Sequence, residues 1–499
     1  MEKKLYIILF IFLIFFTFIP RITEVINGNY VFMFDQGREY LAVKKIVIDH
    51  KLTLIGPELG SGAAGFSGVF QGPVFYYLLA IPLFLFQGDP YGSIILMFFF
   101  GLLTIGFSFY LGNKTFGKWG GLVLSLLVAL SPPLVAQSRL LWAPHLVSLF
   151  VLITFYYVYL IPKNTKYIFL AAFFSAFVYN FELAIAVPLS LVLLLYSVIV
   201  LRFANFKKYI FLFSGYALGL LPMFLFEIRH SFMGIKGTFI YSFQHSETDV
   251  TLKFIELITK DHFKSFIFNF LDTFPRQNII PPLFIFLAVF APVIYFVLKE
   301  KHKDLKHFII FLILLPPISF FVLNFIRSGI FPHYLAHLNL VYILLFVYVA
   351  LKIFEQKSLF LKILLSVFIL IHLINAIPNS IQTFIADLKD YGGTAKNKGK
   401  IDAIDYIYKD SKGKEFGLLV FSPPIYTYPY DYLIQWYAQK KYGYVPHKEK
   451  KGLFYLLIEK DGEKPWSHNG WLETVIKTGK ILETKTLPSG FIVQKRVEE

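Results

Sequence analysis

The residues best suited to chemistry lie in a polar segment at positions 33–50, soon after the first apolar run of the chain. Asp35 opens a mixture of apolar and charged residues that is typical of a short interfacial helix, and Glu39 follows one turn later. A carboxylate in this place can take a proton from an attacking hydroxyl or amine. Gln36 can donate and accept hydrogen bonds but cannot act as a base. The structural alternative for Asp35 is a helix cap, because a helix N-terminus favours a negative charge.

Cationic residues elsewhere in the chain offer the complementary charge. Arg139 and Arg229 are the preferred phosphate-binding pair, since a guanidinium can bind a phosphate through two donors at once. His333 and Tyr334 are further candidates for donor binding, and Arg327 is a weaker one. The alternative for each arginine is that its side chain only extends to the lipid headgroups.

Glu182 completes the predicted set, because an acidic group close to the membrane is costly unless it serves a function. The alternative is that Glu182 lies just outside the membrane and is solvated. The chain contains no Cys, and its His residues lack a recognisable metal-ligand spacing with a glutamate base. We therefore predict no metal ligand and no cofactor, although the sequence leaves open whether a divalent cation binds.

Composition identifies the class of protein that must position these groups. The 499 residues are 56% hydrophobic and 16% charged, whereas soluble domains carry about 25% charged residues. A net charge of +16 suits a nucleic-acid binder, but in a membrane protein it reflects Lys and Arg in the cytoplasmic loops. We predict a multi-pass protein of the cell membrane that binds no nucleic acid.

Apolar runs of nearly spanning length predict about eleven transmembrane helices. The runs lie at 5–20, 92–111, 118–135, 143–161, 167–183, 184–201, 208–226, 280–298, 308–325, 334–352 and 359–377. A shorter run at 72–86 contains two prolines and is predicted not to span, because spanning would move most loop cations to the outer side. The N-terminus is then cytoplasmic, and the first run is an uncleaved helix.

This topology divides the chain into a transmembrane catalytic domain at 1–380 and an extracytoplasmic domain at 381–499. The first domain carries two large outer loops, at 21–91 and 227–279. The tail is rich in Lys, Asp and Gly, and strand-like runs at 417–421, 453–458 and 491–494 alternate with helical segments. The expected fold is therefore an α-helical polytopic membrane protein with a small C-terminal α/β domain.

Several motifs share the predicted outer face and follow one another in a recognisable order. The first span is followed by an acidic residue with a short helix, and then by a helix with the pattern Pro-x-x-Tyr-Tyr at Pro73–Tyr77. Further motifs follow at Leu130–Pro133, Ser138-Arg139, Trp142–Pro144, Leu221-Pro222, Phe226–His230 and Pro332–Tyr334. Over roughly residues 1–350 the chain resembles the GT-C superfamily of glycosyltransferases, in the protein mannosyltransferase and aminoarabinose transferase branch.

The resemblance implies transfer of a sugar from a polyprenyl-phosphate donor to an acceptor outside the cytoplasm, with inversion at the anomeric carbon. Asp35 matches the first-loop acidic residue that acts on the acceptor in that superfamily. The usual acidic pair is here Asp35-Gln36, which puts a two-carboxylate metal site in doubt. Two alternatives stay open: a transporter or flippase for a lipid-linked sugar, and a polymerase or ligase that joins glycans.

Overall fold

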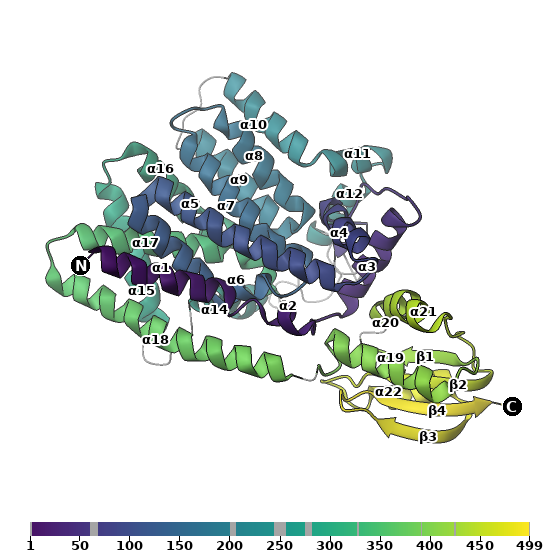
Figure 1. The fold of residues 1–499 in the computed structure, drawn as a ribbon. Helices are drawn as coiled ribbons and strands as arrows, with labels where there is room; N and C mark the ends of the chain where they lie inside the picture. Colours follow the sequence, from purple (N-terminus) through teal and green to yellow (C-terminus); the bar gives the residue numbers. More distant parts are fainter. Residues whose placement is uncertain are drawn as a thin grey trace.

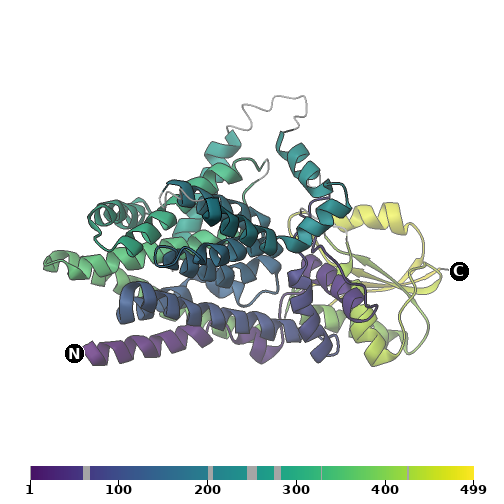
Figure 2. The ribbon, with the colours of Figure 1, turned by 90° about the horizontal axis from the view of Figure 1, so that it is seen from above.

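The computed structural model describes residues 2–59, 68–199, 206–243, 256–274, 282–326, 329–390, 392–423 and 426–498. The chain forms a helical bundle followed by a smaller α/β unit (Figure 1). Both views place the N-terminus at the end of the bundle opposite the α/β unit (Figure 2). The two ends of the bundle are therefore chemically distinct, and only one of them faces the α/β unit.

Among the described residues, five helices are long and apolar enough to cross a membrane. They are Tyr91–Leu130, Ala143–Leu160, Lys303–Leu323, Pro332–Glu355 and Leu359–Lys389. A sixth span arises if α10 (Phe206–Gly219) and α11 (Leu221–Arg229), bent by 72° against each other, count as one. Shorter apolar helices lie at Val74–Leu85, Tyr167–Asn180, Leu183–Val198 and Phe290–Lys299. The multi-pass membrane class is thus confirmed, whereas the predicted total of eleven spans is not.

The longest helical element, α5 (Tyr91–Leu130), reverses direction within its length. Gly117 has a φ of 79°, a conformation that favours glycine. Near the start of α1 (Glu2–Phe18), Tyr6 contacts Trp119 with ring centroids 5.3 Å apart. At the other end of α1, Phe18 lies 6.3 Å from Phe98. The two apolar runs predicted here therefore form an antiparallel pair, and their turn lies beside the N-terminus.

Helix α17 (Ala336–Glu355) is the centre of the bundle, since every residue from Ala336 to Ala350 is buried. The helices that surround it are apolar along most of their length, as a helix buried on several sides must be. The other bundle helices are α6 (Pro132–Gln137), α7 (Val147–Leu160), α8 (Tyr167–Phe177), α9 (Leu183–Ile199), α12 (Met233–Phe243), α14 (Phe263–Thr273), α15 (Pro282–Lys299), α16 (Lys303–Leu323) and α18 (Leu359–Lys389).

Three short helices lie in the segment predicted to be the first outer loop: α2 (Thr23–Asn27), α3 (Phe34–Val47) and α4 (Val74–Leu85). The predicted run at 72–86 corresponds to α4, whose 12 residues extend about 18 Å. A bilayer core of about 30 Å is too thick for such a helix to cross unaided. Helix α4 packs against α3, which in turn contacts the α/β unit.

The C-terminal unit contains a four-stranded sheet in the order β1-β2-β4-β3. Strand β1 (Gly417–Phe421) pairs in parallel with β2 (Gly452–Ile458), while β4 (Ile492–Glu498) is antiparallel to both of its neighbours. The three predicted strands correspond to β1, β2 and β4. Strand β3 (Lys480–Thr486) was not predicted, because it is an edge strand with every side chain exposed and has no apolar pattern. Helices α19 (Asn397–Ser411), α20 (Tyr428–Leu433), α21 (Gln439–Tyr442) and α22 (Ser467–Trp471) accompany the sheet.

The α/β unit docks on α3 through unusually close backbone contact. A Cβ atom built on Gly37 would lie 2.3 Å from the nitrogen of Pro429 at the start of α20, so a side chain there has no room. The ring of Tyr432 lies 4.9 Å from that of Tyr40, and its hydroxyl donates to the carbonyl of Gly88 at 2.5 Å. These contacts fix α3, and therefore the residues at its start, between the bundle and the α/β unit.

Candidate active site

A cavity of about 980 Å³ opens at the end of the bundle that carries the outer-loop helices. It is large enough for a sugar and a phosphate, because ligand sites commonly enclose about 300–1,000 Å³. Its walls come from α3, α6, α14 and α17 and from the segments that precede α4, α7, α9 and α17. Five carboxylates line it: Asp35, Glu39, Glu58, Glu182 and Asp272.

Asp35 lies in the first turn of α3, where the helix dipole stabilises its negative charge. Its carboxylate lines the cavity and keeps about a third of its surface exposed. Arg38, one turn along, contacts Asp35 Oδ1 at 2.9 Å and Glu39 Oε1 at 3.5 Å. Arg38 also lines the cavity. The arginine thus orients Asp35 while leaving part of the carboxylate open to a reactant.

Glu39 belongs to the same wall but is held in a different environment. The residue is only 1% exposed, and burial raises the pKa of its carboxyl to about 8, although Arg38 opposes the shift. Asp35 and Glu39 therefore differ in solvation although they lie one turn apart. Two carboxyl groups with such different environments can serve different roles in one site.

Gln36 is buried and does not line the cavity. Its Oε1 accepts a hydrogen bond from the backbone N–H of Met33 at 2.9 Å, and its Nε2 donates to the carbonyl of Leu141 at 2.7 Å. The side chain therefore closes the first turn of α3 and ties it to the loop before α7. Both of its polar ends are occupied by backbone groups, which leaves neither for a substrate.

The structure brings Glu182, His333 and Tyr334 together on another part of the cavity wall. Glu182 is buried and accepts a hydrogen bond from the N–H of Ala184 at 3.1 Å. Its Oε2 lies 3.8 Å from His333 Nε2. The His333 ring packs edge-on against Trp142, with ring centroids 4.4 Å apart. These three residues line the cavity together with Asp35 and Glu39.

Arg139, which was predicted to bind the donor phosphate, lies elsewhere and pairs with two carboxylates. Its Nε donates to Glu24 Oε2 at 2.9 Å, and its Nη2 pairs with Glu24 Oε1 at 2.5 Å and with Asp387. The residue is absent from the cavity wall. Arg139 therefore joins α2 to the end of α18, and its predicted role beside Arg229 in phosphate binding stays a prediction.

Arg229 lies at the end of α11 with an exposed side chain and does not line the cavity either. Arg327 lies outside the described residues, as do residues 60–67 of the stretch between α3 and α4. Of that stretch, Glu58 is described, and its Oε1 accepts a hydrogen bond from the N–H of Gly68 at 2.8 Å. Among the described residues that line the cavity, Arg38 is the one Lys or Arg.

Several cavity residues were missed by the sequence analysis. Arg38 was counted only as part of the helical pattern of α3. Ser265, Asn269 and Asp272 lie on α14, inside the predicted second outer loop. Their spacing of four and three residues places them on one helix face, so this polar stripe on an otherwise apolar helix was a readable signal. No comparable pattern in the sequence marked Gln71 as a cavity residue.

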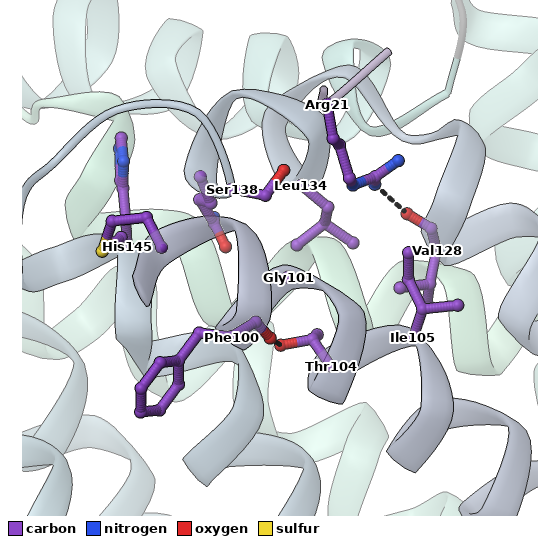
Figure 3. Close-up of a pocket in the computed structure, with 11 residues that line it drawn as sticks. Arg21, Phe100, Gly101, Thr104, Ile105, Val128, Leu134, Ser138 and His145 are labelled. Carbon is purple, nitrogen blue, oxygen red and sulfur yellow. Dashed lines mark hydrogen bonds between the residues drawn. The ribbon is translucent and has the colours of Figure 1, made fainter. Parts of the chain in front are cut away.

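Within the part of the chain that the structure describes, no group of three or more His, Asp or Glu side chains is arranged to hold a metal ion. A second, much smaller cavity of about 10 Å³ lies between α5 and α6 (Figure 3). Buried Arg21 reaches the carbonyls of Val128 and Ala129 there, at 3.5 and 3.0 Å. This space holds a water molecule at most, and Arg21 serves to join the end of α1 to the end of α5.

At the level of the fold, the chain is similar to ArnT, which agrees with the resemblance seen in the sequence. The chain is similar to ArnT from Cupriavidus metallidurans bound to undecaprenyl phosphate, with a TM-score of 0.60 and 10% identity over 99% of this chain and 98% of that chain. The apo state of ArnT aligns with a TM-score of 0.55. The archaeal oligosaccharyltransferase AglB from Archaeoglobus fulgidus gives a TM-score of 0.47 at 13% identity. No protein-family model and no curated protein sequence matches the chain.

Proposed function

We propose that this protein transfers a sugar from a polyprenyl-phosphate donor to an acceptor outside the cytoplasm, with inversion at the anomeric carbon. The observation that carries the proposal is the partly exposed Asp35 carboxylate, held by Arg38 at the wall of a cavity of about 980 Å³. The similar fold of ArnT, bound to undecaprenyl phosphate, supports the choice of donor. The carrier lipid of this chain is inferred from that similarity together with the cavity.

In the proposed reaction a hydroxyl or amine of the acceptor attacks the anomeric carbon of the sugar. Asp35 takes the proton of the attacking group, and the bond between the anomeric carbon and the phosphate oxygen breaks. The polyprenyl phosphate leaves with the electron pair of that bond. A single displacement of this kind inverts the anomeric centre. Arg38 orients Asp35 through their contact of 2.9 Å and is the nearest candidate to attract the leaving phosphate.

The remaining cavity groups are proposed to hold the substrates. Glu182 and His333 form a buried pair on another part of the cavity wall, with Tyr334 beside them. Glu39 lies next to the proposed base. Arg139 and Arg229 are not assigned to the phosphate, because neither lines the cavity.

The proposed orientation places the cavity and the α/β unit outside the cytoplasm of a cell-membrane protein. The N-terminus and the turn at Gly117 lie at the other end of the bundle, where the short loops are rich in lysine. The short apolar helices are proposed to complete the eleven spans predicted from the sequence. We also propose the domain limits 1–380 and 381–499, which place the boundary within the last turns of α18 (Leu359–Lys389).

The test uses the full-length protein in lipid nanodiscs with a panel of polyprenyl-phosphate sugars and a lipid extract of the outer membrane surface as acceptor. The variant Asp35→Asn should reduce the release of polyprenyl phosphate by about 10²–10⁴-fold. Asp49→Asn is a matched control, because Asp49 is an exposed carboxylate just beyond α3 and does not line the cavity. Full activity of Asp35→Asn would remove Asp35 from the mechanism. Lipid translocation without sugar transfer, measured with the protein reconstituted in closed vesicles, would favour the flippase alternative.

A further inference from the structure

Three buried side-chain oxygens in the large cavity have no hydrogen-bond partner among the described residues. They are Glu39 Oε2, Gln71 Oε1 and Asn269 Oδ1. Their residues are 1%, 7% and 8% exposed, and all three line the same cavity. A buried polar atom without a partner costs stability, so native proteins keep few of them without a reason. Three in one cavity indicate that a ligand supplies the missing partners.

The three groups come from separate segments whose backbones are firmly held. Glu39 lies in the middle of α3. The backbone of Gln71 exchanges hydrogen bonds with the neighbouring strand-like segment: its N–H donates to Pro57 at 3.0 Å, and its carbonyl accepts from Gly56 at 2.8 Å. The carbonyl of Asn269 accepts from Thr273 Oγ1 at 2.7 Å. Each side-chain oxygen is thus buried without a partner on a fixed backbone, and a preorganised binding site holds its polar groups in this way.

The chemistry of these oxygens selects among the parts of a lipid-phosphate sugar. The amide oxygens of Gln71 and Asn269 can only accept hydrogen bonds, whereas Glu39 accepts when ionised and donates when protonated. A phosphodiester is ionised and offers only acceptors, and a polyprenyl chain offers neither donors nor acceptors. A sugar hydroxyl both donates and accepts, so it alone satisfies all three groups.

We propose that Glu39, Gln71 and Asn269 form the subsite that binds the hydroxyl groups of the donor sugar. The proposal rests on the proposed function, since it assumes a lipid-linked sugar as substrate. It divides the cavity into two parts: Arg38 attracts the phosphate, and the three oxygens select the sugar. The subsite lies partly on α3, next to Asp35, so a sugar held there has its anomeric carbon near the proposed base.

The test compares the binding of two lipids to the full-length protein in nanodiscs: polyprenyl phosphate, and polyprenyl phosphate carrying mannose or glucose. Gln71→Met and Asn269→Leu replace the amides by apolar side chains of similar size. Each variant should weaken the binding of the preferred sugar-linked lipid by about ten-fold, because a site built to bind hydroxyl groups loses one hydrogen bond. The affinity for bare polyprenyl phosphate should stay the same, which also shows that the variant is folded.

The control is Gln356→Met, the same kind of replacement at an exposed amide just beyond α17. Gln356 does not line the cavity, so its replacement should leave both affinities unchanged. Thermal melting of the unliganded variants supplies an independent measurement. Neither Gln71→Met nor Asn269→Leu should lower the melting temperature, because neither removes a hydrogen bond made by the side-chain oxygen.

Failure of this subsite can be told apart from failure of the proposed function. If the parent transfers sugar while both variants retain its preference for the sugar-linked lipid, the subsite is refuted and the transferase stands. Equal weakening of both lipids likewise refutes the subsite, because the residues would then act on the phosphate or on folding. If the parent neither transfers sugar nor prefers the sugar-linked lipid, both proposals fall.

Discussion

Replacing Glu39 by Gln should make the protein more stable, and the gain should grow as the pH rises. The carboxyl of Glu39 is almost fully buried, and burial raises its pKa from 4.5 to about 8, against the opposing effect of Arg38. A carboxyl whose pKa is higher in the folded protein binds more protons when the protein is folded. Raising the pH therefore destabilises the folded state across the interval between the two pKa values. The glutamine variant has no such group to ionise.

The size of the effect follows from the two pKa values. A ten-fold change in proton affinity corresponds to about 1.4 kcal/mol. The full penalty for ionising Glu39 is therefore about 5 kcal/mol, reached above pH 8 and absent below pH 4.5. Between pH 5 and pH 9, the difference in the free energy of unfolding between Glu39→Gln and the parent should increase by about 4 kcal/mol.

The assay is chemical denaturation of both proteins in the same mixed micelles at several pH values. The difference between them is the relevant quantity, because every other titrating group contributes equally to both. Ser265→Ala removes no titratable group from the same cavity and should follow the parent at each pH. A difference that stays constant from pH 5 to pH 9 would refute the reasoning, since Glu39 would then ionise in the folded protein as easily as in the unfolded chain.

Two further substitutions test how the site is held. Arg139→Ala should lower the free energy of unfolding by about 2 kcal/mol, because it leaves Glu24 and Asp387 without their partner. Arg229→Ala, on an exposed side chain, should change it by less than about 0.5 kcal/mol. Loss of polyprenyl-phosphate affinity at unchanged stability of Arg139→Ala would instead support its predicted role in phosphate binding. Gly37→Ala should release the α/β unit from α3 and expose it to limited proteolysis, because the new methyl group would meet the Pro429 backbone at 2.3 Å. Gly106→Ala is the control, since its added methyl meets nothing within 4 Å, and equal proteolysis of the two variants would contradict the docking.

Local patterns in the sequence were sufficient to predict most of the helices and strands of the fold. Apolar runs identify bundle helices because a buried or lipid-facing helix must be apolar around most of its surface. The turn at Gly117 and the strands β1, β2 and β4, each of which buries part of its side chains, could likewise be predicted from neighbouring residues. Strand β3 was not, because its exposed side chains carry no pattern of burial.

The sequence by itself also determined that Asp35 begins a helix just beyond the first apolar run, because that depends only on residues close in the chain. Only the tertiary structure decided which charged groups share the cavity. Arg139 forms ion pairs with Glu24 and Asp387, which are 115 and 248 residues away. Its partners could therefore not be predicted from the residues next to it in the chain. Gln71 and Asn269 became candidates because they are buried without partners, and whether a group has a partner is a property of the folded chain alone.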